Sequence, residues 1–98
     1  PREYGDMLLR DLFQFAKEQG IALNEEHVDG FRGEFPPGDG DGWASSRPSM
    51  YNPLMGFQVE SEEPGGAKHI AKKFIPFFTR YPELNQEDLA PLLALAQE

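Results

Sequence analysis

The stretch AKHIAKKFIPFFTRY, residues 67–81, sorts apolar and basic side chains onto opposite sides of a helical period. At about 100° per residue, the apolar side chains cover an arc of roughly 160°. This apolar side holds Ile70, Ala71, Phe74, Ile75, Phe77, Phe78 and Tyr81, and the other side holds Lys68, His69, Lys72, Lys73 and Arg80. Pro76 cannot donate a hydrogen bond to the carbonyl of Lys72 and disfavours helix at the preceding residue. The stretch therefore predicts an amphipathic helix with a kink near Pro76.

Residues 5–19, GDMLLRDLFQFAKEQ, carry a second helical pattern. Its apolar stripe consists of Tyr4, Leu8, Leu12 and Phe15, and it is widened by Met7, Leu9, Phe13 and Ala16. Together these side chains cover about 240° of arc, which exceeds the stripe of an ordinary surface helix. Gly20 suits the left-handed conformation that ends a helix. We therefore expect a helix that is either central to the fold or carries an intermolecular contact.

The next segment predicts a short helix that begins at Asn24. Asn24 is a favourable N-cap, and Leu23 and Val28 stand at the two positions of a hydrophobic staple. We expect this helix to end near Gly30 or Gly33.

The centre of the chain is rich in turn-forming residues, since thirteen of its nineteen glycines and prolines fall between Gly30 and Gly66. Residues 36–56 predict a long ordered loop that is pinned by Trp43 or Tyr51. Residues 56–60, GFQVE, alternate between apolar and polar and predict one short strand. A strand needs a partner, which we expect around residues 43–44, around residues 49–51, or in a second chain.

The C-terminal residues repeat the cap-and-staple pattern, with Asn85 as the cap and Leu84 against Leu89. Pro91 lies too deep for a helix from this start to continue undisturbed. Either a turn precedes a helix that begins near Pro91, or the last helix is bent.

These patterns predict an α+β fold, mostly helical, for a small single domain over residues 1–98. We expect about four helices flanking a loop-rich centre with one or two short antiparallel strands. Residues 1–35 and 67–98 form the two helical flanks of this prediction, and residues 36–66 form the Gly/Pro-rich loop and the short strand.

The composition of the chain excludes or disfavours several classes of function. The net charge of −8 makes nucleic acid an unlikely partner, because phosphate binding needs clustered positive charge. The chain has no cysteine, which excludes a disulfide framework, a thiolate metal site and a cysteine nucleophile. No apolar run approaches the ~18 residues of a membrane span. We therefore expect a small acidic protein of the reducing cytoplasm.

No motif of catalysis or metal binding stands out. Gly38 to Trp43, GDGDGW, resembles a cation loop in composition only, because it lacks the spacing of calcium ligands. Asp-Gly pairs are common turn formers, so we interpret this stretch as a turn. His27 and His69 belong to no metal-ligand pair, and Pro1 is not followed by the strand that an N-terminal catalytic proline would open. We assign no catalytic residue, no metal and no cofactor.

The basic face of residues 67–81 is the most distinctive charged feature, and its cations are Lys68, Lys72, Lys73 and Arg80. Such a face can bind an acidic partner or an anionic surface. We favour an interaction with acidic residues of the same chain or of a partner protein, because acidic residues elsewhere repel nucleic acid.

We therefore expect a small interaction or regulatory protein that associates with itself as a homodimer, or with another protein. The candidate contact residues are Leu9, Phe13, Trp43, Tyr51, Phe57 and Phe77. The alternative is a small-ligand-binding protein or an enzyme with a pocket under the loop that carries Trp43 and Tyr51, close to His27.

Overall fold

The computed structural model describes residues 2–23, 30–46, 57–81 and 86–97, and within these ranges the chain forms a small compact α+β domain. Three helices and one four-stranded antiparallel sheet make up the described part. The elements are, in order, α1 (Arg2–Gln19), β1 (Ala22–Leu23), β2 (Phe31–Phe35), β3 (Gly42–Ser46), β4 (Gln58–Ser61), α2 (Gly66–Phe78) and α3 (Gln86–Gln97).

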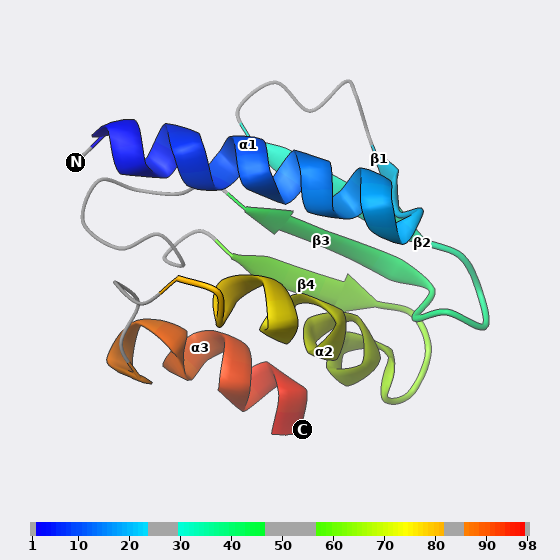
Figure 1. Cartoon of the computed structure of the whole chain (residues 1–98). Coiled ribbons are helices and arrows are strands. Elements are labelled where there is room, and N and C mark those ends of the chain that lie inside the picture. The colour runs from blue at the N-terminus through cyan, green and yellow to red at the C-terminus, as the bar shows by residue number, and fades with distance from the viewer. Residues whose placement is uncertain (1, 24–29, 47–56, 82–85, 98) are drawn as a thin grey trace.

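The strands follow one another across the sheet in chain order, and each is antiparallel to its neighbour. In β2, Phe31 and Phe35 are buried while Glu34 is exposed, as expected when successive side chains point to opposite faces of a sheet. We call the face of Phe31 and Phe35 the inner face and the face of Glu34 the outer face. Figure 1 shows the strand order, with β4 at the edge nearest α2.

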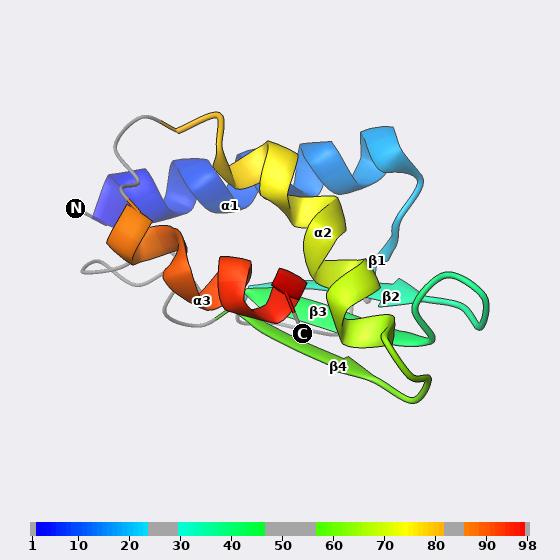
Figure 2. The ribbon, with the colours of Figure 1, turned by 90° about the horizontal axis from the view of Figure 1, so that it is seen from below.

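The helices gather over the inner face. α1 contacts β1 and β2, and α2 contacts β3 and β4 as well as α3. Figure 2 shows α1 and α2 on the same side of the sheet, with the strands below them. The outer face is not covered by any of the described helices.

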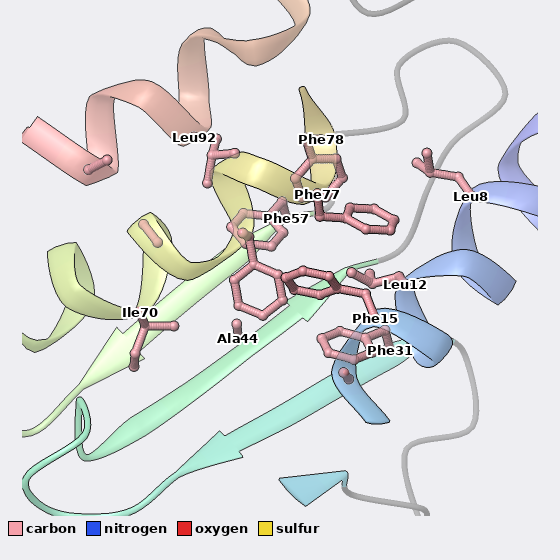
Figure 3. Close-up of a cluster of buried hydrophobic side chains, with 14 of the residues drawn as sticks. Leu8, Leu12, Phe15, Phe31, Ala44, Phe57, Ile70, Phe77, Phe78 and Leu92 are labelled. Atoms are coloured by element: carbon pink, nitrogen blue, oxygen red, sulfur yellow. The ribbon is translucent and has the colours of Figure 1, made fainter. Parts of the chain in front are cut away.

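An aromatic cluster fills the space between the helices and the inner face (Figure 3). Phe74 of α2 lies at its centre and is fully buried. Its ring contacts four others, those of Phe15, Phe31, Phe35 and Phe57, with centroid separations between 5.5 and 6.2 Å. α3 adds Leu92 to the same core.

α1 confirms the helix predicted from residue 5, and it ends where Gly20 takes a φ of 71°. The amide of Ile21 donates to the carbonyl of Ala16 at 2.9 Å, so the helix end is capped by the chain that leaves it. Among its described side chains, the wide apolar arc is used within the molecule except at Met7, which is exposed. Leu9 and Phe13 pack against the core, and the Phe13 ring meets Phe31 edge-on at 5.6 Å.

The two C-terminal helices each contain a proline. α2 confirms the predicted helix but ends at Phe78, where the amide of Thr79 donates to the carbonyl of Ile75 at 3.0 Å. α3 runs from Gln86 through Pro91, so the alternative of a helix that begins near Pro91 is wrong.

The centre of the chain differs from the prediction of one or two strands. The predicted short helix falls partly on residues 24–29, which lie outside the described residues, and its expected end is strand β2. The predicted loop of residues 36–56 contains β3, while residues 47–56 lie outside the described part. The strand predicted at residues 56–60 is confirmed as β4, and so is its pairing, with Trp43 opposite Glu60.

The sequence prediction missed strand β2, and the physical reason lies in its sequence, FRGEF. Its apolar residues alternate strictly, but an arginine, a glycine and a glutamate lower its intrinsic strand propensity. A Cβ at Gly33 would lie 2.8 Å from Cγ2 of Ile21, so a larger residue there would require the Ile21 side chain to shift. Burial of Phe31 and Phe35 against Phe74 outweighs the weak local preference. The fold is therefore less helical than the sequence suggests, and residues 1–35 contain two strands after α1.

Candidate functional site

The outer face of the sheet carries a compact set of polar and aromatic side chains. Its members are Arg32, Glu34, Trp43, Ser45, Gln58 and Glu60. The strand register arranges them in two rows across the sheet. Glu34, Trp43 and Glu60 lie side by side in one row, and the second row begins at Arg32.

Arg32 is held over Trp43, with its guanidinium carbon 4.3 Å from the ring centroid. Both side chains are half-buried. The Nε of Arg32 is buried and donates no hydrogen bond, and no ion pair of Arg32 is found among the described residues. A buried donor without a partner is costly, and a stacked guanidinium keeps its planar fork oriented for a carboxylate. The outer face therefore presents a positioned arginine without a described acidic partner.

The turn between β2 and β3 is held against α2 by a charged cluster. Oδ1 of Asp39 lies 2.7 Å from Nε2 of His69 and 2.9 Å from Nζ of Lys73. The hydrogen bond from Lys73, and then that from His69, lowers the pKa of the Asp39 carboxyl below its ordinary value. We call these three residues the turn clamp.

Backbone groups of the same turn add to this contact. The Glu63 carboxylate accepts a hydrogen bond from the Gly40 amide at 3.1 Å, and the Ser61 hydroxyl donates to the Gly40 carbonyl. Gly40 has a φ of 107° and lies against Ile70 of α2, so a larger residue would be both strained and crowded there. The turn is thus closely fitted to the first half of α2.

The predicted turn of residues 38–43 is confirmed over residues 38–41, whereas Gly42 and Trp43 begin strand β3. The amides of Asp39 and Asp41 both donate to the carbonyl of Pro36 at 3.0 Å. The described residues contain no group of three or more side chains suited to a metal ion.

A groove opens between the end of α1 and α2, with a volume of about 470 Å³. Its residues come from the α1–β1 connection, the end of β2, the turn and the middle of α2. They are Gln19, Gly20, Ile21, Ala22, Glu34, Phe35, Pro36, Asp39, Lys72, Lys73 and Pro76. Asp39 and Lys73 of the turn clamp therefore also form part of the groove wall.

Two of the four cations predicted as a basic face interact with their own chain. Lys73 pairs with Asp39, and the guanidinium of Arg80 lies over the rings of Phe15 and Phe77 at 5.6 and 5.0 Å. Lys68 and Lys72 have no ion pair among the described residues. The intramolecular interpretation of this face therefore applies to Lys73.

The structure separates the predicted contact residues. Trp43 lies on the outer face, and Leu9 and Phe13 lie half-buried on α1. Phe57 and Phe77 are buried in the core at 7% and 0% exposure, so neither offers a surface to a partner in this fold. The remaining candidates, Tyr51 and His27, lie outside the described residues. Trp43 does not line the groove described above.

Several residues of these sites were missed by the sequence prediction. Arg32 and Glu34 could have been placed on one face from the alternation of Phe31, Gly33 and Phe35, had that segment been interpreted as a strand. The pairing of Asp39 with α2 joins residues 30 or more positions apart and leaves no local signal. The groove likewise combines distant segments.

None of the described helices is long and apolar enough to cross a bilayer. The cytoplasmic location stays a prediction from the sequence. No protein-family model, curated protein or solved structure matches this chain.

Proposed function

We propose that the protein is a small interaction module that associates with itself through the outer face of its sheet. The observation that carries this proposal is the guanidinium of Arg32, stacked on Trp43 and without a described acidic partner. Tryptophan and arginine are enriched at the energetic centres of protein interfaces. Arg32 and Trp43 both lie on the outer face of the sheet, where their side chains are partly exposed.

The charges of the outer face suit a second copy of the same chain. Arg32 and Glu34 lie two residues apart on the same face of β2. A two-fold axis that crosses β2 between them would place Arg32 of each copy opposite Glu34 of the other. Such an interface is isologous, because every contact occurs twice.

The same two-fold axis also determines which residues of β3 lie opposite each other in the two copies. Trp43 is the cross-strand partner of Glu34, and Ser45 is the partner of Arg32. The rotation therefore brings Trp43 opposite Ser45 of the second copy, a small residue that is 9% exposed within one copy. A large side chain opposite a small one is the arrangement that lets two packed layers interdigitate.

The proposal is tested with two charge-reversing variants, R32E and E34R. Each variant alone would bring like charges together twice across the two-fold axis, so we expect both to be monomers where the wild type is a dimer. A mixture of the two restores opposite charges at both contacts. Native mass spectrometry distinguishes the chains by mass, and we expect a mixed dimer of one R32E and one E34R chain.

Circular dichroism of each variant checks that the fold is retained, since both side chains lie outside the core. A wild type that stays monomeric at all concentrations contradicts self-association. A dimer that persists in R32E or E34R, or a mixture that forms no mixed dimer, contradicts this interface.

The alternative of a ligand pocket under the loop of Trp43 and Tyr51 is not favoured by any described contact. Trp43 does not line the observed groove, and Tyr51 lies outside the described residues.

A further inference from the structure

The groove between α1 and α2 has the size and form of a small-molecule site. Its volume of about 470 Å³ lies within the range of ligand pockets, which is about 300–1,000 Å³. One wall is formed by residues 19–22 after α1, and the other by Lys72, Lys73 and Pro76 of α2. Neither Arg32 nor Trp43 lines the groove, and Glu34 is the one residue that it shares with the interface proposed above.

Apolar groups make up much of its surface. Ile21 comes from the connection after α1, Phe35 and Pro36 come from the end of β2, and Pro76 comes from α2. Proline rings and a phenyl ring are rigid, so a ligand that covers them loses little side-chain entropy of the protein. This part of the groove suits the apolar body of a ligand.

Four charged residues line the groove, and two of them pair with each other. Glu34 lines the groove from β2, where its side chain is exposed and has no ion pair among the described residues. Asp39 and Lys73 neutralise each other in the turn clamp at 2.9 Å.

Lys72 is the fourth charged residue of the groove. Its side chain is exposed, and no ion pair of Lys72 is found among the described residues. It is therefore a cation beside an apolar surface, without a described counter-charge.

From these observations we infer that the groove binds a small monocarboxylate with an apolar body. The carboxylate accepts a charge-assisted hydrogen bond from Nζ of Lys72, and the body covers Phe35, Pro36 and Pro76. A doubly charged phosphate ester is a poorer fit, because only one cation is unmatched and Asp39 lies in the same wall. The chain's net charge of −8 also disfavours a strongly anionic ligand.

The probe is 4-phenylbutyrate, titrated into uniformly ¹⁵N-labelled protein and followed by amide chemical shifts. We expect the shifts to concentrate at Gly20, Ile21, Phe35, Lys72 and Lys73. The uncharged amide analogue, 4-phenylbutyramide, keeps the same apolar body and lacks the negative charge. It should bind about five- to tenfold more weakly, as expected for the loss of one charge-assisted hydrogen bond.

The matched variants are K72Q and K68Q, which remove the same charge from the same helix. Lys68 lies one turn before Lys72 and does not line the groove. K72Q should weaken phenylbutyrate binding about five- to tenfold, while K68Q should change it less than about twofold.

The inference is overturned if the amide binds as tightly as the acid, if K72Q and K68Q have equal effects, or if the shifts fall on the outer face. An absence of shifts at high probe concentration overturns it as well. The binding test uses K72Q and K68Q, which leave Arg32 and Glu34 unchanged, so the two proposals fail separately.

Discussion

The two faces of the same four strands differ in how they are used. The inner face presents Phe31 and Phe35 to the helices, and Phe74 of α2 joins them to Phe15 and Phe57 in one aromatic cluster. The outer face presents charged and polar residues around a single half-buried tryptophan. Since both faces come from alternate residues of the same strands, neither can change its register without moving the other.

The comparison indicates a division of roles. The inner face buries enough apolar surface to hold the sheet and the helices together, so its side chains are expected to determine stability. The outer face contributes few apolar contacts among the described residues, so its side chains are available for recognition. Substitutions on the two faces should therefore differ both in size and in the property that they change.

The largest effect is expected for Phe74→Ala. Removal of a fully buried ring that contacts four others should lower the free energy of unfolding by about 3–5 kcal/mol. That loss is a large part of the roughly 5–15 kcal/mol typical of a small domain. Urea denaturation followed by circular dichroism measures it.

Trp43→Ala is the control from the outer face, with an expected loss of only about 1–2 kcal/mol, from partial burial and the stacking of Arg32. Both variants are measured at the same protein concentration, because self-association adds to apparent stability. Equal losses would show that Trp43 belongs to a second core and would remove the distinction between the faces.

A smaller change in the free energy of unfolding, this time a gain, is expected from a substitution in β3. Ser46 is fully buried on the inner face opposite Phe31, and its hydroxyl oxygen has no hydrogen-bond partner among the described residues. A buried hydroxyl without a partner lowers stability, so Ser46→Ala should raise the free energy of unfolding by about 1 kcal/mol. The matched control is Ser45→Ala on the outer face, where no gain is expected. A loss of stability in Ser46→Ala would show that the hydroxyl has a partner in solution.

The positions of α1 and α2 were predictable from sequence because apolar residues that recur with the helical period identify a helix without any long-range information. The apolar arcs of residues 5–19 and 67–81 predicted α1 and α2, and Gly20 correctly predicted the end of α1. The strands were harder, since β2 and β3 contain glycines and polar residues whose burial depends on pairing and on the aromatic cluster. β4 was recognised from its local alternation because, unlike β2 and β3, it contains no glycine.

The candidate sites depend even more on long-range geometry. Trp43 was identified as a contact residue, but its neighbours Arg32 and Glu34 follow only from the register of β2 and β3. Lys72 was identified as part of a basic face, and what distinguishes it from Lys73 is the pairing of Lys73 with Asp39. A single sequence contains the residue types of these sites and no record of which segments the fold brings together.

The smallest change in stability is expected from a substitution in the turn clamp, whose polar contacts join the turn between β2 and β3 to α2. Asp39 is 46% exposed and Lys73 is 32% exposed, so solvent screens their ion pair and Asp39→Asn should cost about 1 kcal/mol or less at neutral pH. The folded state lowers the pKa of Asp39, first through Lys73 and then through His69. The stabilisation is therefore complete above the ordinary aspartate pKa of about 4 and is lost as the pH falls through the lower folded value.

The stability difference between wild type and Asp39→Asn should accordingly be present at about pH 5 and should shrink below about pH 4. Asp41→Asn is the matched control, because it removes the same charge from the same turn and Asp41 has no ion pair among the described residues. Thermal unfolding of the three proteins across this pH range provides the measurement. If Asp41→Asn shows the same pH dependence, the effect belongs to the net charge of the chain. The turn would then be held by the Glu63–Gly40 and Ser61–Gly40 hydrogen bonds without help from Asp39.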